Sequence, residues 1–442
     1  MALFLERLAE LLWGPATLMI ILGAGIYFSL GTRFLSLRKL KKAFSLVLKG
    51  EGEGEVSPFS ALCTSLGATL GTGNVIGIAT ALAGGGPGAL FWMVLAALLG
   101  MAIRYGEGVL AIAYRKKLPN GQFLGGPFFY LEKGARSPLL AKIFAAACLL
   151  CCLLSLGTTS QINGIATAAT SLSGSGWGAL LAGVGVCFFT GVALEGGFRR
   201  IARICSLLVP IMAAIFLFLI LWILFQNTKE IPSALRLIFH SAFRPQAALS
   251  GIGGFSLQKA IRFGLGRGIF SNEAGMGSDP IAAACAKCSS PHHQGLISML
   301  GPFIDTVLLC SLTGLALVLT GVWADPALSG AEITLAALQT LPLPKGFIAL
   351  LYFLCLLFFG LASILGWSFY GSQSLLYLFP QKPPLKLFRF LFLSMLMLGA
   401  LLPVGAVWSL ADILCALMTF PNLLGLLLLS PEIFHTAKTA KI

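Results

Sequence analysis

The sequence predicts an all-α polytopic membrane protein of about eleven transmembrane helices, two of them broken by glycine-rich stretches. Apolar residues make up 57% of the 442 positions and charged residues only 10%, a balance that fits a chain embedded in a bilayer better than any soluble fold. Apolar runs of about 20 residues recur along the whole length, with short polar loops between them. We therefore expect residues 1–442 to form one membrane domain.

The spans can be assigned in chain order, with a basic segment between the first two. The first run, about 11–30, is longer than the apolar core of a signal peptide and is taken as a span. Residues 34–48 mix Phe and Leu with Lys and Arg, which is typical of a helix in the headgroup plane. The other spans are expected near 57–82, 88–114, 139–172, 176–194, 201–225, 246–270, 295–322, 346–374, 386–405 and 409–429.

Basic residues in the loops predict the orientation. The net charge of +14 reflects loops that meet anionic lipid headgroups, and we expect no nucleic-acid partner. Lys and Arg gather in alternate loops, whereas the turns at 83–86 and 171–176 hold none. This pattern predicts a multi-pass protein of a cytoplasmic or inner membrane, with its N-terminus outside and its C-terminus inside. In the basic connection 226–246 we expect a short surface helix between Pro232 and Phe243.

The stretch that organises the chain is 57–82, which contains Gly71-Thr72-Gly73-Asn74 in its middle. The bilayer core offers no water to free N–H and C=O groups, so irregular backbone at that depth must be buried in protein or line a wet cavity. A helix that ends near Gly71 and restarts near Asn74 would present free carbonyls and a positive helix end at the midplane, which suits a small cation and a carboxylate. The alternative is a glycine-rich helix that only packs closely on its neighbours.

A second interrupted segment, Ser250-Gly251-Ile252-Gly253-Gly254-Phe255, follows five spans later. Irregular segments at matching positions indicate a transporter built from inverted repeats, with its site between the two breaks. Residues 57–225 and 226–430 would form two five-helix repeats, with 1–56 as an added N-terminal span and basic segment and 431–442 as a cytoplasmic tail. Because the chain has no ATP motif, the expected driving force is an ion gradient.

Several blocks resemble a known transporter family. They are GATLGTGNVIG at 67–77, GGPGALFWM at 85–93, GRGIFSNEAG at 266–275, GWSFYG at 366–371 and PNL at 421–423. On these motifs the sequence resembles the alanine or glycine:cation symporters, also called sodium:alanine symporters, over most of its length. The resemblance implies a leucine-transporter-like fold on ten of the spans and import of alanine or glycine on a sodium gradient.

Expected substrate residues come from both breaks and two further spans. At the first break, glycines let backbone amides approach a carboxylate, and Asn74 can cap the second half-helix or meet the ligand. Gln161, preferred over Asn163, matches a polar position of the family, and the Trp367 ring could close the pocket. The expected set is Thr72, Gly73, Asn74, Gln161, Gly251, Gly253, Gly254, Phe255 and Trp367.

Sodium is expected as a co-transported ligand, and no cofactor is expected. By analogy with the fold, carbonyls at Ala68 and Gly71 would face a hydroxyl at Ser363. The family carries a hydroxyl pair here, and the Ala at position 362 removes one of the two. Ser60, Thr158, Ser372 and Cys415 are further departures. The choice of alanine, glycine or serine as substrate therefore stays open, and so does the identity of the coupling ion.

Charged residues inside the spans support a second hypothesis for the coupling ion. Asp305 lies inside the eighth span, and Arg104 and Glu107 are three residues apart, so they should pair on one helix face. A proton-coupled transporter of the same fold would use Asp305 or Glu107 as its titrating group.

Two other classes of function are less well supported. A membrane-embedded enzyme would need a nucleophile or a metal cluster, and a passive channel would not need substrate-binding half-helices. Cys285 and Cys288, followed by His292 and His293, have partial metal-ligand spacing but lack the paired context of a zinc site.

Overall fold

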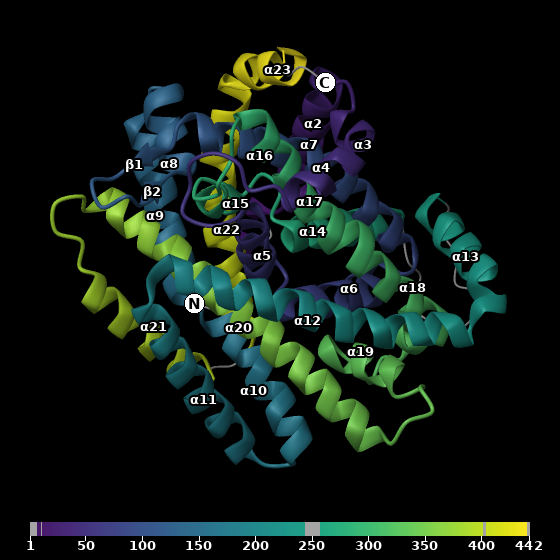
Figure 1. The fold of residues 1–442 in the computed structure, drawn as a ribbon. Helices are drawn as coiled ribbons and strands as arrows, with labels where there is room; N and C mark the ends of the chain where they lie inside the picture. Colours follow the sequence, from purple (N-terminus) through teal and green to yellow (C-terminus); the bar gives the residue numbers. More distant parts are fainter. Residues whose placement is uncertain (1–6, 10, 244–256, 401–403, 440–442) are drawn as a thin grey trace.

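Helices make up almost all of the regular structure in this computed structural model, which describes residues 7–9, 11–243, 257–400 and 404–439 (Figure 1). The one sheet in the described ranges is an antiparallel hairpin of β1 (Lys116–Lys117) and β2 (Phe123–Leu124). The all-α prediction is confirmed. The membrane-sized helices and half-helices are α2 (Pro15–Gly31), α5 (Pro58–Thr69), α6 (Thr72–Gly85), α7 (Gly88–Ala113), α9 (Pro138–Leu154), α10 (Thr159–Ser173), α11 (Gly176–Glu195), α12 (Gly197–Gln226), α14 (Leu257–Asn272), α18 (Ser311–Thr320), α20 (Lys345–Leu378), α21 (Leu385–Gly399) and α22 (Val404–Leu428).

Short helices fill the connections. They are α3 (Leu35–Arg38), α4 (Leu40–Val47), α8 (Pro127–Phe129), η1 (Tyr130–Gly134), η2 (Thr228–Glu230), α13 (Ile231–Phe243), α15 (Asp279–Ala283), α16 (Pro291–Ser298), α17 (Leu300–Pro302), η3 (Phe303–Cys310), η4 (Val322–Ala324), α19 (Ala331–Leu338) and α23 (Ser430–Thr439). The predicted surface helix in the basic connection is confirmed as α13, and the predicted basic helix appears as two pieces, α3 and α4. The hairpin, α19 and α23 were not predicted.

Within the described residues, seven helices are long and apolar enough to cross a membrane, or eight if α5 and α6 count as one bent span. The helices α2 and α21, of 17 and 15 residues, and α14, of 16, lie where three further spans were predicted but are shorter than the rest. The count of eleven thus stays a prediction.

Besides the span broken between α5 and α6, two further predicted spans are not continuous α-helices. The fourth is interrupted between α9 and α10, where Thr158 Oγ1 donates to Leu153 O at 2.6 Å and Thr159 Oγ1 donates to Leu154 O at 2.8 Å. These hydroxyls take over carbonyls that the helix would otherwise pair, which allows the backbone to leave the helix inside the protein. The eighth contains the π-helical segment η3 between α17 and α18. Such wider turns are frequent at functional sites.

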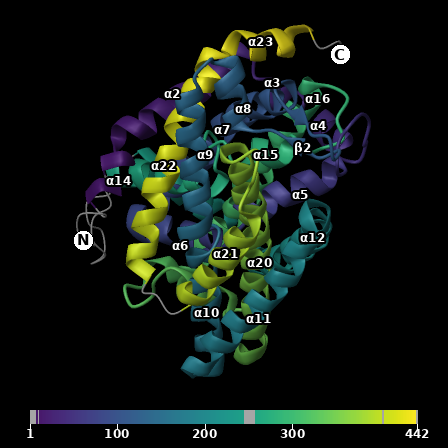
Figure 2. The same cartoon turned by 90° about the vertical axis from the view of Figure 1, so that its left-hand side faces the viewer.

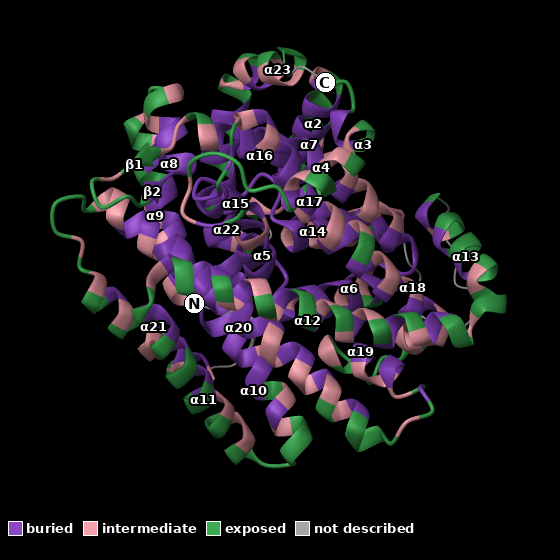
Figure 3. Ribbon diagram, in the orientation of Figure 1, coloured by how far each residue is buried: buried purple, intermediate pink, exposed green. Residues whose placement is uncertain are grey.

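Burial separates an inner set of helices from an outer set. Figure 3 shows α5, α15 and α22 mostly buried and α11 and α13 with long exposed stretches. In the view turned by 90°, α22 runs beside α9, on which it packs (Figure 2). The outer helices expose large apolar side chains, including Phe188, Phe225 and Phe390 at 75%, 78% and 67%. Such surfaces are expected to face lipid.

Candidate functional site

The first predicted break is confirmed. Helix α5 ends at Thr69, α6 begins at Thr72, and the two axes are bent by 50°. Gly71 has extended backbone (φ −88°, ψ −173°), and its carbonyl accepts from Asn74 N at 3.2 Å. Gly73 is the second residue of α6. The C-terminal end of α5 and the N-terminal end of α6 therefore both lie inside the protein, where their free backbone groups need hydrogen-bond partners.

Gln161 of α10 supplies one of these partners. Its Oε1 accepts from Thr72 N at 3.0 Å and from Thr72 Oγ1 at 3.1 Å. This close approach requires glycine at position 71, because a Cβ there would lie 2.6 Å from Gln161 Oε1. The predicted capping role of Asn74 is wrong, since no side chain of the break caps α6. A residue 89 positions away takes that role instead.

The carbonyl end of α5 meets α20. Ser363 Oγ donates to Ala68 O at 2.9 Å, and both residues are buried. The helices come this close because small residues face each other. A Cβ on Gly366 would lie 2.8 Å from Ala68 Cβ, and one on Gly67 would lie 3.2 Å from Ala362 Cβ. The methyl of Ala362 therefore packs against α5, while the carbonyl and the hydroxyl of the predicted ion site do lie together.

Asn74 points to the eighth predicted span. Its amide Nδ2 donates to Asp305 Oδ1, and Asp305 Oδ2 accepts from Ser271 Oγ at 2.9 Å and Thr306 Oγ1 at 2.6 Å. Asp305 is fully buried in η3 and forms no salt bridge with any described residue. The amide of the first break, the end of α14 and the π-helical segment thus meet at one carboxylate.

Trp367 lies on the same helix as Ser363, one turn further on. It is fully buried, its ring makes an edge contact with Tyr370 at 5.5 Å between centroids, and its Nε1 has no hydrogen-bond partner among the described residues. A Cβ on Gly157, in the interruption between α9 and α10, would lie 2.9 Å from Trp367 Cβ. Packing explains the burial of the Trp367 ring but not the unsatisfied Nε1 donor.

A second buried polar cluster forms around Arg104 of α7. The predicted pair with Glu107 is confirmed at 3.4 Å, and Arg104 also donates to Asn272 O at 2.7 Å and lies 3.8 Å from Asp279. Asp279 in turn accepts from Ser65 Oγ of α5. The cluster therefore ties α5 and the end of α14 to the scaffold helix α7.

The motif PNL also joins this cluster. Asn422 Nδ2 donates to Glu107 Oε1 at 2.7 Å and to Gly275 O at 2.8 Å, and Tyr130 donates to Asn422 Oδ1. Glu107 Oε1 further accepts from Gly277 N at 3.1 Å. Two matched motifs far apart in the chain, 266–275 and 421–423, thus meet at the Asn422 amide, which also donates to the Glu107 carboxylate.

Four predicted substrate residues, Gly251, Gly253, Gly254 and Phe255, lie outside the described residues. Sequence reasoning did not find the role of Ser271 as a partner of Asp305, although this residue lies in the matched block 266–275. Nor did it find the interruption at Ser155–Thr158 beside Trp367. All eleven cysteines are free. His292 Nδ1 is paired with Tyr105 OH at 2.8 Å.

Comparisons with known proteins assign the family. The profile of the sodium:alanine symporter family matches residues 1–440. An uncharacterized transporter of Haemophilus influenzae is 43% identical over 437 residues, which cover 98% of this chain and 95% of that protein. The sodium/alanine symporter AgcS of Methanococcus maripaludis is 40% identical over 436 residues, covering 96% and 94%. The probable sodium/glutamine symporter GlnT of Bacillus subtilis is 35% identical over 437 residues, covering 97% and 88%.

Solved transporters share the fold at low identity. A substrate-bound, outward-open Na⁺-coupled sialic acid symporter has a TM-score of 0.52 and 14% identity, covering 90% of this chain and 82% of that one. A manganese transporter of Eremococcus coleocola has a TM-score of 0.52 and 15% identity, covering 86% and 78%. The helical architecture is thus of the leucine-transporter-like class, and the protein is a multi-pass secondary transporter and not an enzyme. The chain belongs to the sodium:alanine symporter family.

Proposed function

We propose that this protein imports a small neutral amino acid, alanine or glycine, with sodium, by alternating access around the break between α5 and α6. Membership of the family supports sodium and alanine as the transported pair. One relative is named a probable sodium/glutamine symporter, so the size of the substrate that this chain accepts depends on its own pocket. The opposite wall of that pocket would be Gly251, Gly253, Gly254 and Phe255, and the repeats would be residues 57–225 and 226–430.

The observation that carries the proposal is the pairing of both ends of the break with other helices. Sodium would bind at the Ala68 and Gly71 carbonyls and the Ser363 hydroxyl, since the hydroxyl already lies 2.9 Å from the Ala68 oxygen. A bound ion would take the Ser363 lone pair while the hydroxyl proton turns away. The donor set is neutral oxygen only, which suits a monovalent hard cation better than a divalent one.

The amino acid would bind at the start of α6. Its carboxylate would meet the positive helix end at Thr72 and Gly73, where Gln161 now accepts from the Thr72 amide, so Gln161 would have to yield or turn its own NH₂ to the substrate. Asn74 would orient it from the next turn. Trp367 Nε1, which has no partner among the described residues, would supply a further buried donor for an acceptor inside the site. Each ligand would favour the state that the other prefers, which is the basis of coupling.

Loop charge supports the orientation. The basic connections before α5 and after α7, together with α23 and the chain end, would face the cytoplasm, with the N-terminus outside, in a cytoplasmic or inner membrane.

Uptake of labelled alanine into proteoliposomes tests the proposal. The variant is Ser363→Ala, and the matched control is Ser368→Ala on the same helix, whose buried hydroxyl donates only within its own helix, to Leu365 O at 2.6 Å. Removing one neutral oxygen ligand should weaken sodium binding by about 1–1.5 kcal/mol. The sodium concentration for half-maximal uptake should then rise about tenfold. Unchanged sodium dependence in Ser363→Ala would overturn the ion site, and uptake driven by a proton gradient alone would overturn sodium coupling.

One observation favours proton coupling as the second candidate. Asp305 is a fully buried carboxyl, unpaired with any cation among the described residues, and bonded to Asn74 of the first break. Protonation of a carboxyl group in that position could change its hydrogen bond to Asn74 and so affect substrate binding. Asp305→Asn would then abolish proton-driven uptake while preserving counterflow exchange of alanine; a parent protein with no proton-driven uptake would remove this candidate.

A further inference from the structure

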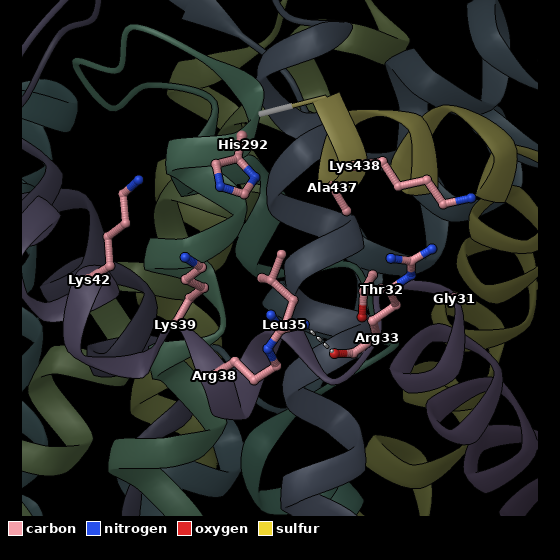
Figure 4. Close-up of a pocket in the computed structure, with 10 residues that line it drawn as sticks. All are labelled: Gly31, Thr32, Arg33, Leu35, Arg38, Lys39, Lys42, His292, Ala437 and Lys438. Atoms are coloured by element: carbon pink, nitrogen blue, oxygen red, sulfur yellow. Dashed lines mark hydrogen bonds between the residues drawn. The ribbon is translucent and has the colours of Figure 1, made fainter. Parts of the chain in front are cut away.

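A basic cavity lies where the turn between α2 and α3 meets α4, α16 and α23. Its volume is about 350 Å³. Its lining includes Arg33, Arg38, Lys39, Lys42 and Lys438, with His292 from the start of α16 (Figure 4). These side chains come from three parts of the chain far apart in sequence, and they have no role in the transport site described above. The function of this cavity is therefore separate from that of the transport site.

No acidic side chain among the described residues compensates the positive charge of this cavity. No Asp or Glu lines it, and the three salt bridges among the described residues involve none of its five Lys and Arg side chains. Lys39 and Lys42 are only half-exposed. Like charges that line one cavity repel each other, and the repulsion falls when an anion binds between them. A phosphate group fits both the charge and the hydrogen-bond donors.

The turn holds this arrangement in place. Arg33 and Phe34 both have left-handed backbone, with φ of 55° and 53°, a conformation uncommon outside glycine. Phe34 N donates to Ser29 O at 2.7 Å, which closes the turn at the end of α2, and Arg38 Nη1 lies 3.5 Å from Arg33 O. His292 is fixed from behind by Tyr105 OH at 2.8 Å. The cavity is thus shaped by ordered backbone and not by free side chains alone.

Apolar side chains surround the same turn. Leu30, Phe34 and Leu37 are 59%, 47% and 53% exposed. In a protein that spans a membrane, exposed leucine and phenylalanine next to clustered lysine and arginine mark the boundary between acyl chains and headgroups. A soluble phosphate would use only the basic part of this surface, whereas a phospholipid would use both parts.

We propose that this cavity binds the phosphate of an anionic phospholipid, with the acyl chains lying along Leu30, Phe34 and Leu37. The bound lipid would join three segments that lie far apart in sequence, namely α3 with α4, α16, and α23. Because α16 begins the segment that continues into η3 and Asp305, the lipid would also stabilise one end of that segment. This proposal requires a membrane protein but does not depend on the identity of the substrate or the coupling ion.

The test is the thermal stability of the purified full-length protein in detergent, with short-chain phosphatidylglycerol, phosphatidylcholine of the same chains, or inorganic phosphate added. The variant is Lys39→Gln/Lys42→Gln. The control is Lys41→Gln/Lys116→Gln, which removes the same charge from exposed lysines outside the cavity. Phosphatidylglycerol should raise the midpoint in the parent and the control. Two lysines near an anionic headgroup predict about 30-fold weaker binding in the variant.

Equal shifts with phosphatidylcholine, or an undiminished phosphatidylglycerol shift in the Lys39→Gln/Lys42→Gln variant, would overturn the proposal. An equal shift with inorganic phosphate would replace the lipid by a soluble anion. Native mass spectrometry of the same preparations provides a readout independent of unfolding: the parent should retain anionic lipid through purification, and the variant should lose it while the control keeps it.

Discussion

Replacing Gln161 by Leu tests the view that this side chain holds the start of α6. Leu is similar in size but has no acceptor for Thr72 N or Thr72 Oγ1, which lie 3.0 and 3.1 Å from Gln161 Oε1. A buried N–H without a partner costs about 1–3 kcal/mol, and the hydroxyl adds less because it can rotate to another acceptor. We expect the free energy of unfolding to fall by about 2 kcal/mol.

The measurement is reversible unfolding in mixed micelles, combined with alanine uptake. Thr167→Val is the control on the same helix, because the Thr167 hydroxyl donates only to Asn163 O within α10, at 2.9 Å. Thr72→Val completes a double-mutant cycle in which the coupling should be about 0.5–1.5 kcal/mol, one hydrogen bond. If Gln161→Leu is no less stable than Thr167→Val, or the cycle shows no coupling, then Gln161 does not support the break.

Three further changes test other parts of the structure. Gly71→Ala places a Cβ 2.6 Å from Gln161 Oε1, so it should destabilise by about 1–3 kcal/mol, and Gln161→Ala should partly relieve this in a thermal-shift assay; additive losses would contradict the clash. Arg104→Met leaves the Glu107 carboxylate buried without its cation and should cost about 3–5 kcal/mol, seen as a lower unfolding midpoint; a loss under 1 kcal/mol would show that Arg104 is not needed to compensate these acids. Burial raises the pKa of Glu55. Its contribution to stability should be complete below the ordinary glutamate pKa and be lost as pH rises through the raised value. Glu55→Gln should therefore flatten the pH dependence of the unfolding midpoint above about pH 4, and an unchanged profile would refute this.

The fold was predictable where the sequence carries its own periodicity or a break in it. The four residues from Gly71 to Asn74 predict the bend of α5 and α6 because glycine in a membrane span removes the side chains that would keep it regular. The interruption at Ser155–Thr158 gave no such signal. Its glycine and hydroxyl residues also occur inside continuous membrane helices, and only their bonds to Leu153 O and Leu154 O distinguish the two cases.

The sequence named candidate residues for the site but not the contacts between them. Gln161 and Asn74 were both expected near the substrate, yet their partners, Thr72 and Asp305, lie 89 and 231 positions away. From the sequence alone, Asn74 is a reasonable capping residue for α6. In the structure it does not cap the helix, because the buried Asp305 carboxylate accepts its amide and Gln161 caps α6 from another span. Such competition depends on tertiary packing, which periodicity does not encode.

The position of α5 explains how an ion at the break could control a contact one turn away. Ser65 and Ala68 are three residues apart on α5, so they face the same side of the helix. Ser65 contacts Asp279 and Ala68 contacts Ser363. Because α5 is a short half-helix that ends at the break, a tilt of α5 would displace both residues and strain both contacts. Sodium at the Ala68 carbonyl and Ser363 would strengthen one of them and, through the rigid turn between, favour the other. Arg104 contacts the same Asp279 from the scaffold helix α7, so the state with α5 held in place would be the state with the ion bound. Coupling of this kind requires no moving part beyond one half-helix.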